Sequence, residues 1–459
     1  MESQTQDMTP PAVAGSLPEL RQRVFKLAGP AIVENLLHTM VGVMDTAMVG
    51  RLGAYALASV GLANQIFNIS LTVFAALATG STALVARHIG AEQQDEASEV
   101  ARQSLVVGVF VSGAVLAVLA GFGPWILRLL FPRAEEAVLY HGGLYVRIVA
   151  VAQMFNYFLI IINGILRGAG DTRTPMLITA LVNCINVVLN ACLIYGLGPF
   201  PAWGVAGAAV ATAISQTIGG ILAIRQLFAG ALLSVKLSDS FRPNSTMIRR
   251  IMNIGVPAGV EQGIMRVAHL VYTMVVSSLG TVAYAAHQVA LNAESLSFMP
   301  GSGFAVAATT LVGQSLGADR PDEAHRAGDE ARRMAVVVMS IMGAVFLLFP
   351  RPIVGIFSRD PEVVELAVAC LRLVALSQPA LATIMVLAGG LRGAGDVRPI
   401  MRITLVGFIL VRIGLAYLLA IVLEMGLIGA WIGMVVDLFF RSFLVNRHFQ
   451  SGHWKLIKV

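Results

Sequence analysis

The chain has 459 residues, of which 57% are hydrophobic and only 13% are charged, and its mean hydropathy is +0.78. Soluble globular proteins carry about 25% charged residues, so this composition excludes a soluble enzyme, a disordered scaffold and a small disulfide-linked module. A polytopic membrane protein fits instead, because a span needs only ~20 apolar residues and lipid accepts an apolar exterior. The net charge of +6 is typical of basic cytoplasmic loops. We therefore predict a lipid bilayer, and no nucleic acid, as a partner.

The cysteines do not indicate a metal site. Cys184, Cys192 and Cys370 all lie in apolar runs, without a CxxC motif or a Cys/His cluster. An odd number with no metal-ligand spacing argues against a disulfide framework and against a metal centre. We interpret the three as small apolar residues.

The chain begins with a polar stretch and continues with twelve apolar ones. Residues 1–20 contain two acidic residues before position 10 and no apolar run, which excludes a signal peptide, so we expect residues 1–25 to form a cytoplasmic tail. None of the apolar stretches shows the ~10-residue alternating segments of a membrane β-barrel. We predict an all-α membrane protein with twelve transmembrane helices. The stretches are 28–50, 57–86, 104–130, 140–165, 175–197, 204–228, 251–278, 284–312, 334–357, 363–389, 400–423 and 427–446.

The distribution of Lys and Arg predicts the orientation. With the N-terminus inside, most Lys and Arg of the connecting segments lie on the cytoplasmic side, as the positive-inside rule requires. We therefore predict a multi-pass protein of the inner (plasma) membrane with both termini in the cytoplasm. Only five basic residues remain in outer segments: Arg51, Arg128, Arg133, Arg351 and Arg359.

An internal repeat divides the chain into two halves. The sequence LRGAGD at 166–171 recurs at 391–396, and Glu34 and Gly90 have counterparts in Glu261 and Gly317 at nearly the same offset. Each half has six helices, so both halves enter the membrane from the same side and a pseudo-two-fold axis runs along the membrane normal. Transporters built from such repeats bind substrate between the halves and work by alternating access. The predicted parts are an N-lobe (26–229), a cytoplasmic linker (230–250), a C-lobe (251–447) and a cytoplasmic C-terminal tail (448–459).

Three ionisable side chains lie on one face of the first predicted helix. His38 and Asp45 follow Glu34 by four and eleven residues, which at ~100° per residue places all three on a narrow stripe. Ionisable groups are costly inside a membrane, so this stripe should face the protein interior. One interpretation is a cation-titrating site, in which a partly desolvated carboxylate exchanges protons. The alternative is a local hydrogen bond between Glu34 and His38 beside a satisfied Asp45.

Asparagines add two further polar stripes to the N-terminal half. Asn183, Asn186 and Asn190 share a face of the fifth helix, and Asn156 and Asn163 share a face of the fourth. Amide oxygens suit a hard cation or a water molecule beside a carboxylate, although such residues also bind helices to one another in membranes. Three stripes together favour a hydrated cavity in this half.

The C-terminal half carries a different set of polar residues. Glu261 repeats Glu34, but Met265 and Tyr272 replace the counterparts of His38 and Asp45. Glu261 is the main functional candidate here, and a structural ion pair between Arg412 and Asp437 is as plausible as a role in transport. Other polar residues within these spans are Arg266, His269, His287, Asn292, Glu294 and Arg372.

The repeated LRGAGD segments lie in predicted cytoplasmic loops. Their glycines permit a tight turn, Asp171 and Asp396 can cap the next helix, and Arg167 and Arg392 would face the anionic leaflet. The segments lack the GKS/T ending of a phosphate-binding loop, so we interpret them as hinge and topology elements. The sequence FMPGSG at 298–303 should kink or break the eighth helix, since proline lacks a backbone donor. Further kinks are expected at Pro30, Pro257 and Pro379.

These motifs together resemble the multidrug and toxic compound extrusion (MATE) family. The resemblance covers nearly the whole chain after residue 25 and depends on MVGVMDTAMVGRLG around Asp45, LRGAGDTRTP at 166–175, AAHQVALN at 285–292, FMPGSGFAVAATTLVGQSLGA at 298–318 and the second LRGAGD. It implies a V-shaped pair of six-helix lobes that exports cationic amphiphilic small molecules in exchange for protons or sodium ions.

The resemblance also implies roles for individual residues. Asp45 matches the first-helix aspartate of the family's N-lobe cation site, Asn186 its fifth-helix asparagine, and Thr212 its sixth-helix threonine. Asn190 stands where many members have a second acid. Glu261 resembles the glutamate of a C-lobe sodium site, but the tenth-helix aspartate of that site has no counterpart in SQPALATIMVLAGGLRG at 377–393. The coupling site is therefore expected at Asp45.

We predict a secondary active multidrug exporter that is not an enzyme, needs no cofactor and functions as a monomer. Protons are favoured over sodium ions as the coupling ion. The alternative is a flippase for lipid-linked sugars, which would need a strongly basic central cavity. The candidate residues are Asp45, Glu34, His38, Asn186, Asn190, Thr212 and Asn156 in the N-lobe, and Glu261, His287 and Asp437 in the C-lobe.

Overall fold

The computed structural model is all-α, as the apolar stretches predict. It describes residues 16–197, 200–229, 233, 235–236 and 239–457, and this part of the chain contains no strand. Residues 1–15 of the predicted N-terminal tail lie outside it. The elements are α1 (Leu17–Gly50), α2 (Ala54–Gly90), α3 (Gln94–Leu130), α4 (Glu136–Ala169), α5 (Arg173–Tyr195), α6 (Val205–Ala229), α7 (Ser245–Ser277), α8 (Thr281–Gly317), α9 (Pro321–Leu348), α10 (Pro350–Gly355), α11 (Pro361–Gly393), α12 (Val397–Val406), η1 (Gly407–Ile413), α13 (Gly414–Tyr417), η2 (Leu418–Val422), α14 (Gly426–Ser451) and η3 (His453–Leu456).

The predicted membrane spans correspond to these helices. In the described residues, 11 helices are long and apolar enough to cross a membrane, with α12 to η2 counted as one 26-residue helix. The remaining predicted span, 251–278, corresponds to α7 and its C-cap residue Ser278. This helix has 33 residues and carries Glu261 and Arg266. A helix of this length extends about 50 Å, so α7 can also cross the bilayer.

Several helices extend beyond the apolar stretches. Ser16 and Glu19 form a capping box, so that α1 begins within the predicted tail, and Leu20 and Val24 are buried. Asn244 caps α7 inside the predicted linker, accepting from two backbone amides. Hydropathy detects the part of a helix that lies in lipid, whereas caps and packing decide where the helix ends. The predicted C-terminal tail likewise begins inside α14, and Trp454 packs on Phe449 with a centroid distance of 4.8 Å.

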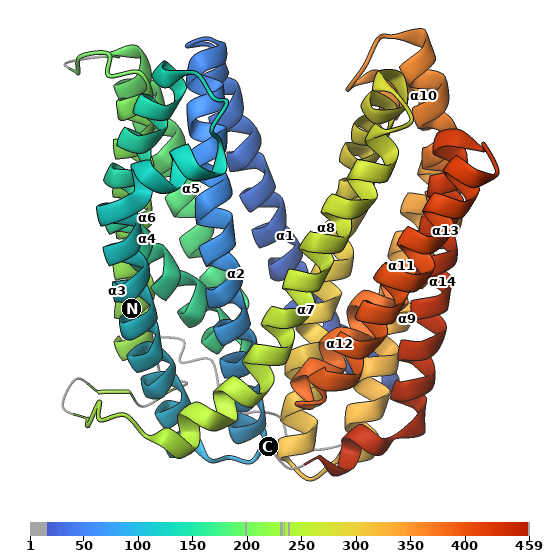
Figure 1. Cartoon of the computed structure of the whole chain (residues 1–459). Helices are drawn as coiled ribbons and strands as arrows, with labels where there is room; N and C mark the ends of the chain where they lie inside the picture. The colour runs from blue at the N-terminus through green and yellow to red at the C-terminus, as the bar shows by residue number, and fades with distance from the viewer. Residues whose placement is uncertain (1–15, 198–199, 230–232, 234, 237–238, 458–459) are drawn as a thin grey trace, which may run out of the picture.

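The helices form two bundles, which confirms the predicted two-lobe architecture. The N-lobe (α1–α6) and the C-lobe (α7–α14) meet at one end, which we call the vertex end, and diverge toward the other, the open end (Figure 1). The first helix of each lobe begins against the other lobe. The first turns of α1, including Leu20 and Ala28, pack with α8 and α9, and those of α7, including Ile251 and Ala258, pack with α2 and α3.

The repeat is visible in backbone contacts at the vertex end. A Cβ atom on Gly90 would lie 1.9 Å from the carbonyl oxygen of Gln314, and one on Gly317 would lie 1.9 Å from that of Arg87. Gly317 follows Gly90, and Gln314 follows Arg87, by the same offset of 227 residues. The two contacts are therefore pseudo-two-fold mates, and they bring the ends of α2 and α8 together without intervening side chains.

Hydrogen bonds within the lobes follow the same repeat. The Thr82 hydroxyl in α2 donates to the carbonyl of Gly164 in α4 at 2.8 Å. Thr309 in α8 donates to Gly389 in α11 at 2.9 Å. Threonine at this position bonds two neighbouring helices, which is a common means of holding helices together in lipid.

Two local features refine the prediction. Of the predicted kink or break in the eighth helix, the break does not occur: α8 continues through Pro300, and Ser297 and Ser302 donate to carbonyls one turn earlier. Hydroxyls of this kind let membrane helices accommodate proline. The unpredicted feature is the π-helical segment η1, where a Cβ on Gly407 would lie 2.4 Å from the Arg441 side chain.

We predict that Gly90→Ala and Gly317→Ala each destabilise the protein. The added methyl group would overlap a backbone carbonyl of the other lobe, and overpacking of this kind costs about 1–3 kcal/mol. Thermal unfolding of the purified protein in detergent measures the effect. The matched control is Gly61→Ala in α2, whose Cβ meets nothing within 4 Å. This control should leave stability unchanged or raise it, because alanine favours helix. Equal stability of all three variants would contradict close backbone packing at the vertex end.

Candidate functional site

The central feature of the N-lobe is a chain of polar side chains across α1, α5 and α6. Asn190 in α5 donates to Oδ1 of Asp45 in α1 at 2.7 Å and to Oδ1 of Asn186 at 3.0 Å. Asn186 in turn donates to the hydroxyl of Ser215 in α6 at 3.2 Å. Asn186 and Asn190 share a face because they are four residues apart on a helix. We call Asp45, Asn186, Asn190 and Ser215 the N-lobe site.

Burial divides the N-lobe site into a fixed part and an accessible part. Asn186, Asn190 and Ser215 are buried, whereas Asp45 is only half-buried and so remains within reach of a ligand. Asn183 ties α5 to α1 by donating to the carbonyl of Leu37 at 2.8 Å, which positions the asparagines against Asp45. A carboxylate held in this way can bind a proton or a cation.

The N-lobe site contains one carboxylate and neutral polar groups. The described residues contain no group of three or more His, Cys, Asp or Glu side chains that could hold a metal ion. One negative charge beside amide oxygens suits a proton or a monovalent cation better than a divalent metal, which requires several charged ligands.

The sixth helix contributes to the site through a residue that sequence reasoning missed. Thr212 accepts a hydrogen bond from Tyr145 at 3.5 Å, whereas Asn186 donates to Ser215, one turn further along α6. Neither Ser215 nor Tyr145 was predicted. The spacing of three residues between Thr212 and Ser215 was the available signal, because such residues share a helix face.

Glu34 belongs to a separate cluster. Eleven residues separate it from Asp45, which is about 16 Å along a helix axis. It accepts from Asn163 at 3.4 Å and lies 3.7 Å from the guanidinium of Arg167, both in α4. His38 is exposed between the two clusters and interacts electrostatically with Glu34 and Arg167, without a hydrogen bond to Glu34 within the described residues.

Among the described residues, Asn156 makes no hydrogen bond to the N-lobe site. It donates to Gln153 on the same helix at 2.9 Å. The stripe on α4 therefore contributes Asn163 to the Glu34 cluster, and Asn156 to a bond within α4.

The repeat places a matching ion pair in the C-lobe. Nη2 of Arg392 donates to both carboxylate oxygens of Glu261 at 2.9 Å, and Thr404 donates to the same group at 3.4 Å. Arg167 and Arg392 are the arginines of the two LRGAGD segments. The prediction that they face the lipid leaflet is wrong, because both turn toward a buried glutamate of the same lobe.

The aspartates of the two LRGAGD segments have different partners. Oδ1 of Asp171 accepts from the backbone amides of Arg173 and Thr174 at 3.0 Å, so it caps α5 as predicted. Asp396 instead bonds to His448 of α14 at 2.6 Å. The repeat thus preserves the turn but not the cap.

Asp437 forms a buried ion cluster, and the predicted pair with Arg412 is confirmed. Arg412 bonds to Asp437 at 2.9 Å, and Arg441 does so through two nitrogens at 2.9 and 2.8 Å. Both guanidinium groups also lie over the ring of Phe408, 4.2 and 4.4 Å from its centroid. The negative charge of Asp437 is compensated inside the bundle, which favours a structural role for this residue. His287 lies elsewhere in the C-lobe, buried between Tyr272 and Trp431.

Comparisons with known proteins agree with the two-lobe geometry. The MatE family model matches residues 30–192 and 257–418, one segment in each lobe. The chain is 33% identical to the "probable multidrug resistance protein NorM" of Thermotoga maritima, with 96% of this chain and 94% of that protein covered. It is 32% identical to a protein of the same name from Pseudomonas aeruginosa, with 97% and 91% covered.

A solved structure has the same fold. It is described as the "outward-facing conformation of a multidrug resistance MATE family transporter" and aligns with a TM-score of 0.87 at 23% identity, covering 96% of this chain and 99% of that one. The matched segments, the identity to whole relatives and the two repeated bundles lead to one conclusion. The chain belongs to the MATE family of multi-pass membrane transporters.

Proposed function

We propose that the protein is a multidrug exporter that exchanges a cationic amphiphilic molecule for a proton by alternating access. The observation that carries this proposal is the half-buried carboxylate of Asp45, bonded to Asn190 and bridging helices of one lobe. The relatives named as probable multidrug resistance proteins support the substrate class. No organic cofactor and no enzymatic step are needed for such an exchange.

Coupling follows from the single charge of the N-lobe site. A cationic drug and a proton would compete for the carboxylate of Asp45, because a second positive charge in an apolar bundle would be left uncompensated. Protonation from outside would release the drug, and loss of the proton to the cytoplasm would restore an anionic site. Sodium could compete in the same way, but a lone carboxylate offers it few oxygen ligands.

The apolar part of a substrate would contact α1 around Asp45. Met40, Val43 and Met44 are exposed large side chains on this helix. Methionine is flexible and polarisable, so it adapts to ligands of different shape. A negative charge among such side chains suits amphiphilic cations.

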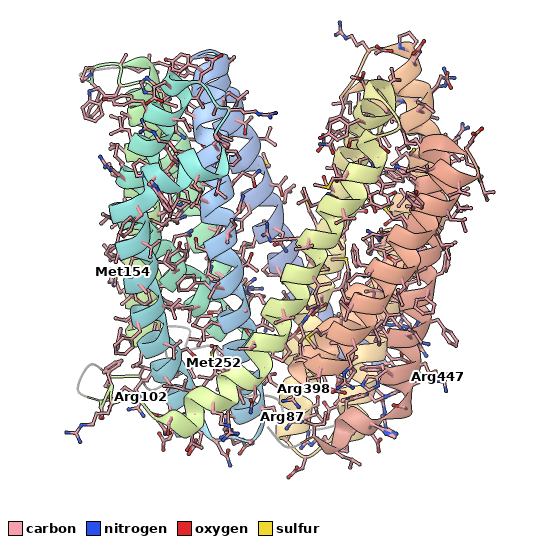
Figure 2. All side chains as sticks on the ribbon, in the orientation of Figure 1. Arg87, Arg102, Met154, Met252, Arg398 and Arg447 are labelled. Atoms are coloured by element: carbon pink, nitrogen blue, oxygen red, sulfur yellow. The ribbon has the colours of Figure 1, made fainter. Side chains whose placement is uncertain are left out.

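The vertex end is proposed to face the cytoplasm. Arg87, Arg102, Arg398 and Arg447 all lie toward this end (Figure 2). By the positive-inside rule we therefore expect both termini in the cytoplasm and the open end outside the cell. The similarity to an outward-facing structure is consistent with this orientation. We further propose that the protein acts as a monomer in the inner membrane, because the N-lobe site is complete within one chain.

Our first prediction for transport concerns Asp45→Asn. In proteoliposomes, wild-type protein should move ethidium in response to an imposed pH gradient, and the variant should not, since an amide cannot exchange the proton. The matched control is Asp95→Asn, which changes an exposed aspartate in the first turn of α3. This control should transport as the wild type does.

Other results would assign the function differently. Transport that survives Asp45→Asn under a pH gradient would exclude coupling through Asp45. Transport driven by sodium in this variant would move the coupling to the C-lobe around Glu261. Absence of ethidium movement under either gradient would favour the flippase for lipid-linked sugars.

A second prediction separates structural from coupling carboxylates. Glu261→Gln removes one partner of a largely buried ion pair, which typically costs about 3–5 kcal/mol when burial is complete. We expect a marked loss of thermal stability, with ethidium transport still driven by the pH gradient. Glu34→Gln should be milder, because its guanidinium partner lies 3.7 Å away. A stable Glu261→Gln protein whose transport ignores the pH gradient would contradict this assignment.

A further inference from the structure

A second cluster of polar groups lies in the C-lobe. Tyr272 of α7, His287 and Glu294 of α8 and Trp431 of α14 form this C-lobe polar cluster, and all four are buried. The ring of His287 lies 5.6 Å from that of Tyr272 and 5.7 Å from that of Trp431. Glu294 follows His287 by two helical turns and interacts electrostatically with Tyr272.

The polar atoms of this cluster lack hydrogen-bond partners. Within the described residues, no partner is found for the hydroxyl of Tyr272, for either ring nitrogen of His287 or for Nε1 of Trp431. The carboxylate of Glu294 likewise makes no hydrogen bond or ion pair with any described residue. Unbonded buried donors and acceptors cost free energy, and clusters of them are typical sites of ordered water. The cluster therefore supplies the donors and acceptors that a small group of water molecules requires.

Charge compensation distinguishes Glu294 from the other carboxylates of the lobe. Glu261 pairs with Arg392, and Asp437 pairs with both Arg412 and Arg441. One carboxylate beside two guanidinium groups leaves one positive charge in excess. Arg412 also interacts electrostatically with Glu294, so an ionised Glu294 would balance that excess, and a protonated one would need no partner. Arg412 of η1 and Tyr272 of α7 interact electrostatically with Glu294 itself. The charged and titratable groups one step further away are His269 of α7, which interacts with His287, Cys370 of α11, which interacts with Tyr272, and Asp437 of α14, which pairs with Arg412.

The internal repeat relates the cluster to the N-lobe site. Tyr272 follows Asp45 by 227 residues, the offset that also relates the vertex contacts. The C-lobe thus has a neutral hydroxyl where the N-lobe has its carboxylate. The acidic group of the C-lobe is Glu294, which lies nearby on α8. The N-lobe residue at the equivalent position is Phe67. Repeat-related positions lie at similar depths in the membrane.

The local backbone suits a movable counter-charge. Arg412 belongs to the π-helical segment η1, and π-helical turns are frequent at functional sites. In this structure its Nε bonds to Asp437, which retains two bonds from Arg441. Asp437 would therefore stay compensated if Arg412 turned toward Glu294.

We propose that Glu294 is a second proton-binding carboxylate, in a hydrated site formed with Tyr272, His287 and Trp431, and that Arg412 compensates its charge when the proton leaves. The proton passes between a water molecule and a carboxylate oxygen of Glu294. The role of this site in transport rests on the proposed proton-coupled exchange, whereas proton binding by Glu294 can be measured without transport.

The test is pH-difference infrared spectroscopy of the full-length protein in liposomes. Protonated carboxyl groups give a C=O band that ionised ones lack, so each group that titrates contributes one band. We expect Glu294→Gln to remove a band that Asp45→Asn and Glu261→Gln both retain. His287→Asn should move the pH midpoint of that band, because it alters a polar group facing the same site.

The outcomes separate this inference from the proposed function. A Glu294→Gln spectrum identical to that of the wild type would overturn the inference. Loss of the Glu294 band in Glu294→Gln, with no band assigned to Asp45, would support the inference and contradict coupling through Asp45. If Glu294→Gln does not fold, as judged by gel filtration and circular dichroism, Glu294→Asp serves instead. A displaced band in that variant supports proton binding, and an unchanged carboxyl region excludes it.

Discussion

The organisation of this protein depends on how charge is compensated in an apolar bundle. A carboxylate within a membrane loses its hydration, so it needs a cation, hydrogen-bond donors or a proton. Glu34, Glu261 and Asp437 each have a guanidinium partner within 4 Å, which compensates their charge. Asp45 has only an amide, and Glu294 has no partner among the described residues. These two carboxylates are therefore the ones in this set whose charge could change without breaking an ion pair, which is why the proposed proton exchange is assigned to them.

The same constraint shows in where the ion pairs of the two lobes lie. The ion pairs of Glu34 and Glu261 lie within single lobes and join the first helix to a later one. Between the lobes, the described contacts at the vertex end include close backbone approaches at glycine and the bond of Thr310 to the carbonyl of Arg167 at 2.8 Å. Two ion pairs also join the lobes there, because Arg21 and Arg23 of α1 pair with Glu330 and Glu323 of α9. Charge therefore acts within each lobe and also holds the start of α1 on the other lobe.

The sequence contains enough information for the helices, the repeat and the stripe on α1. It does not show at which level along the helix axis the other helices contact that stripe. Glu34 and Asp45 lie on one face of α1 but at different levels, so they meet different partners. The partners of Arg167 and Arg392 were mispredicted for a related reason. A basic residue in a glycine-rich loop resembles a lipid-facing anchor until the fold brings a buried glutamate within 4 Å. Ser215 and the π-helical turn at Gly407 likewise depend on contacts between distant segments, which local patterns do not record.

The divergence of the two halves follows from the chemistry of a repeated site. An exact duplication would place a carboxylate at 272 as well as at 45, and both would compete for the same cationic substrate and the same protons. With Tyr272 in that position, the C-lobe lost the symmetric charge, and its acidic group at Glu294 stands beside Arg412 instead. A carboxylate beside a guanidinium attracts a cationic drug less than a lone carboxylate does, because the net charge of the two groups is zero. In the proposed exchange, the N-lobe is the side that attracts a cationic drug by charge, and the C-lobe can take up a proton without binding one.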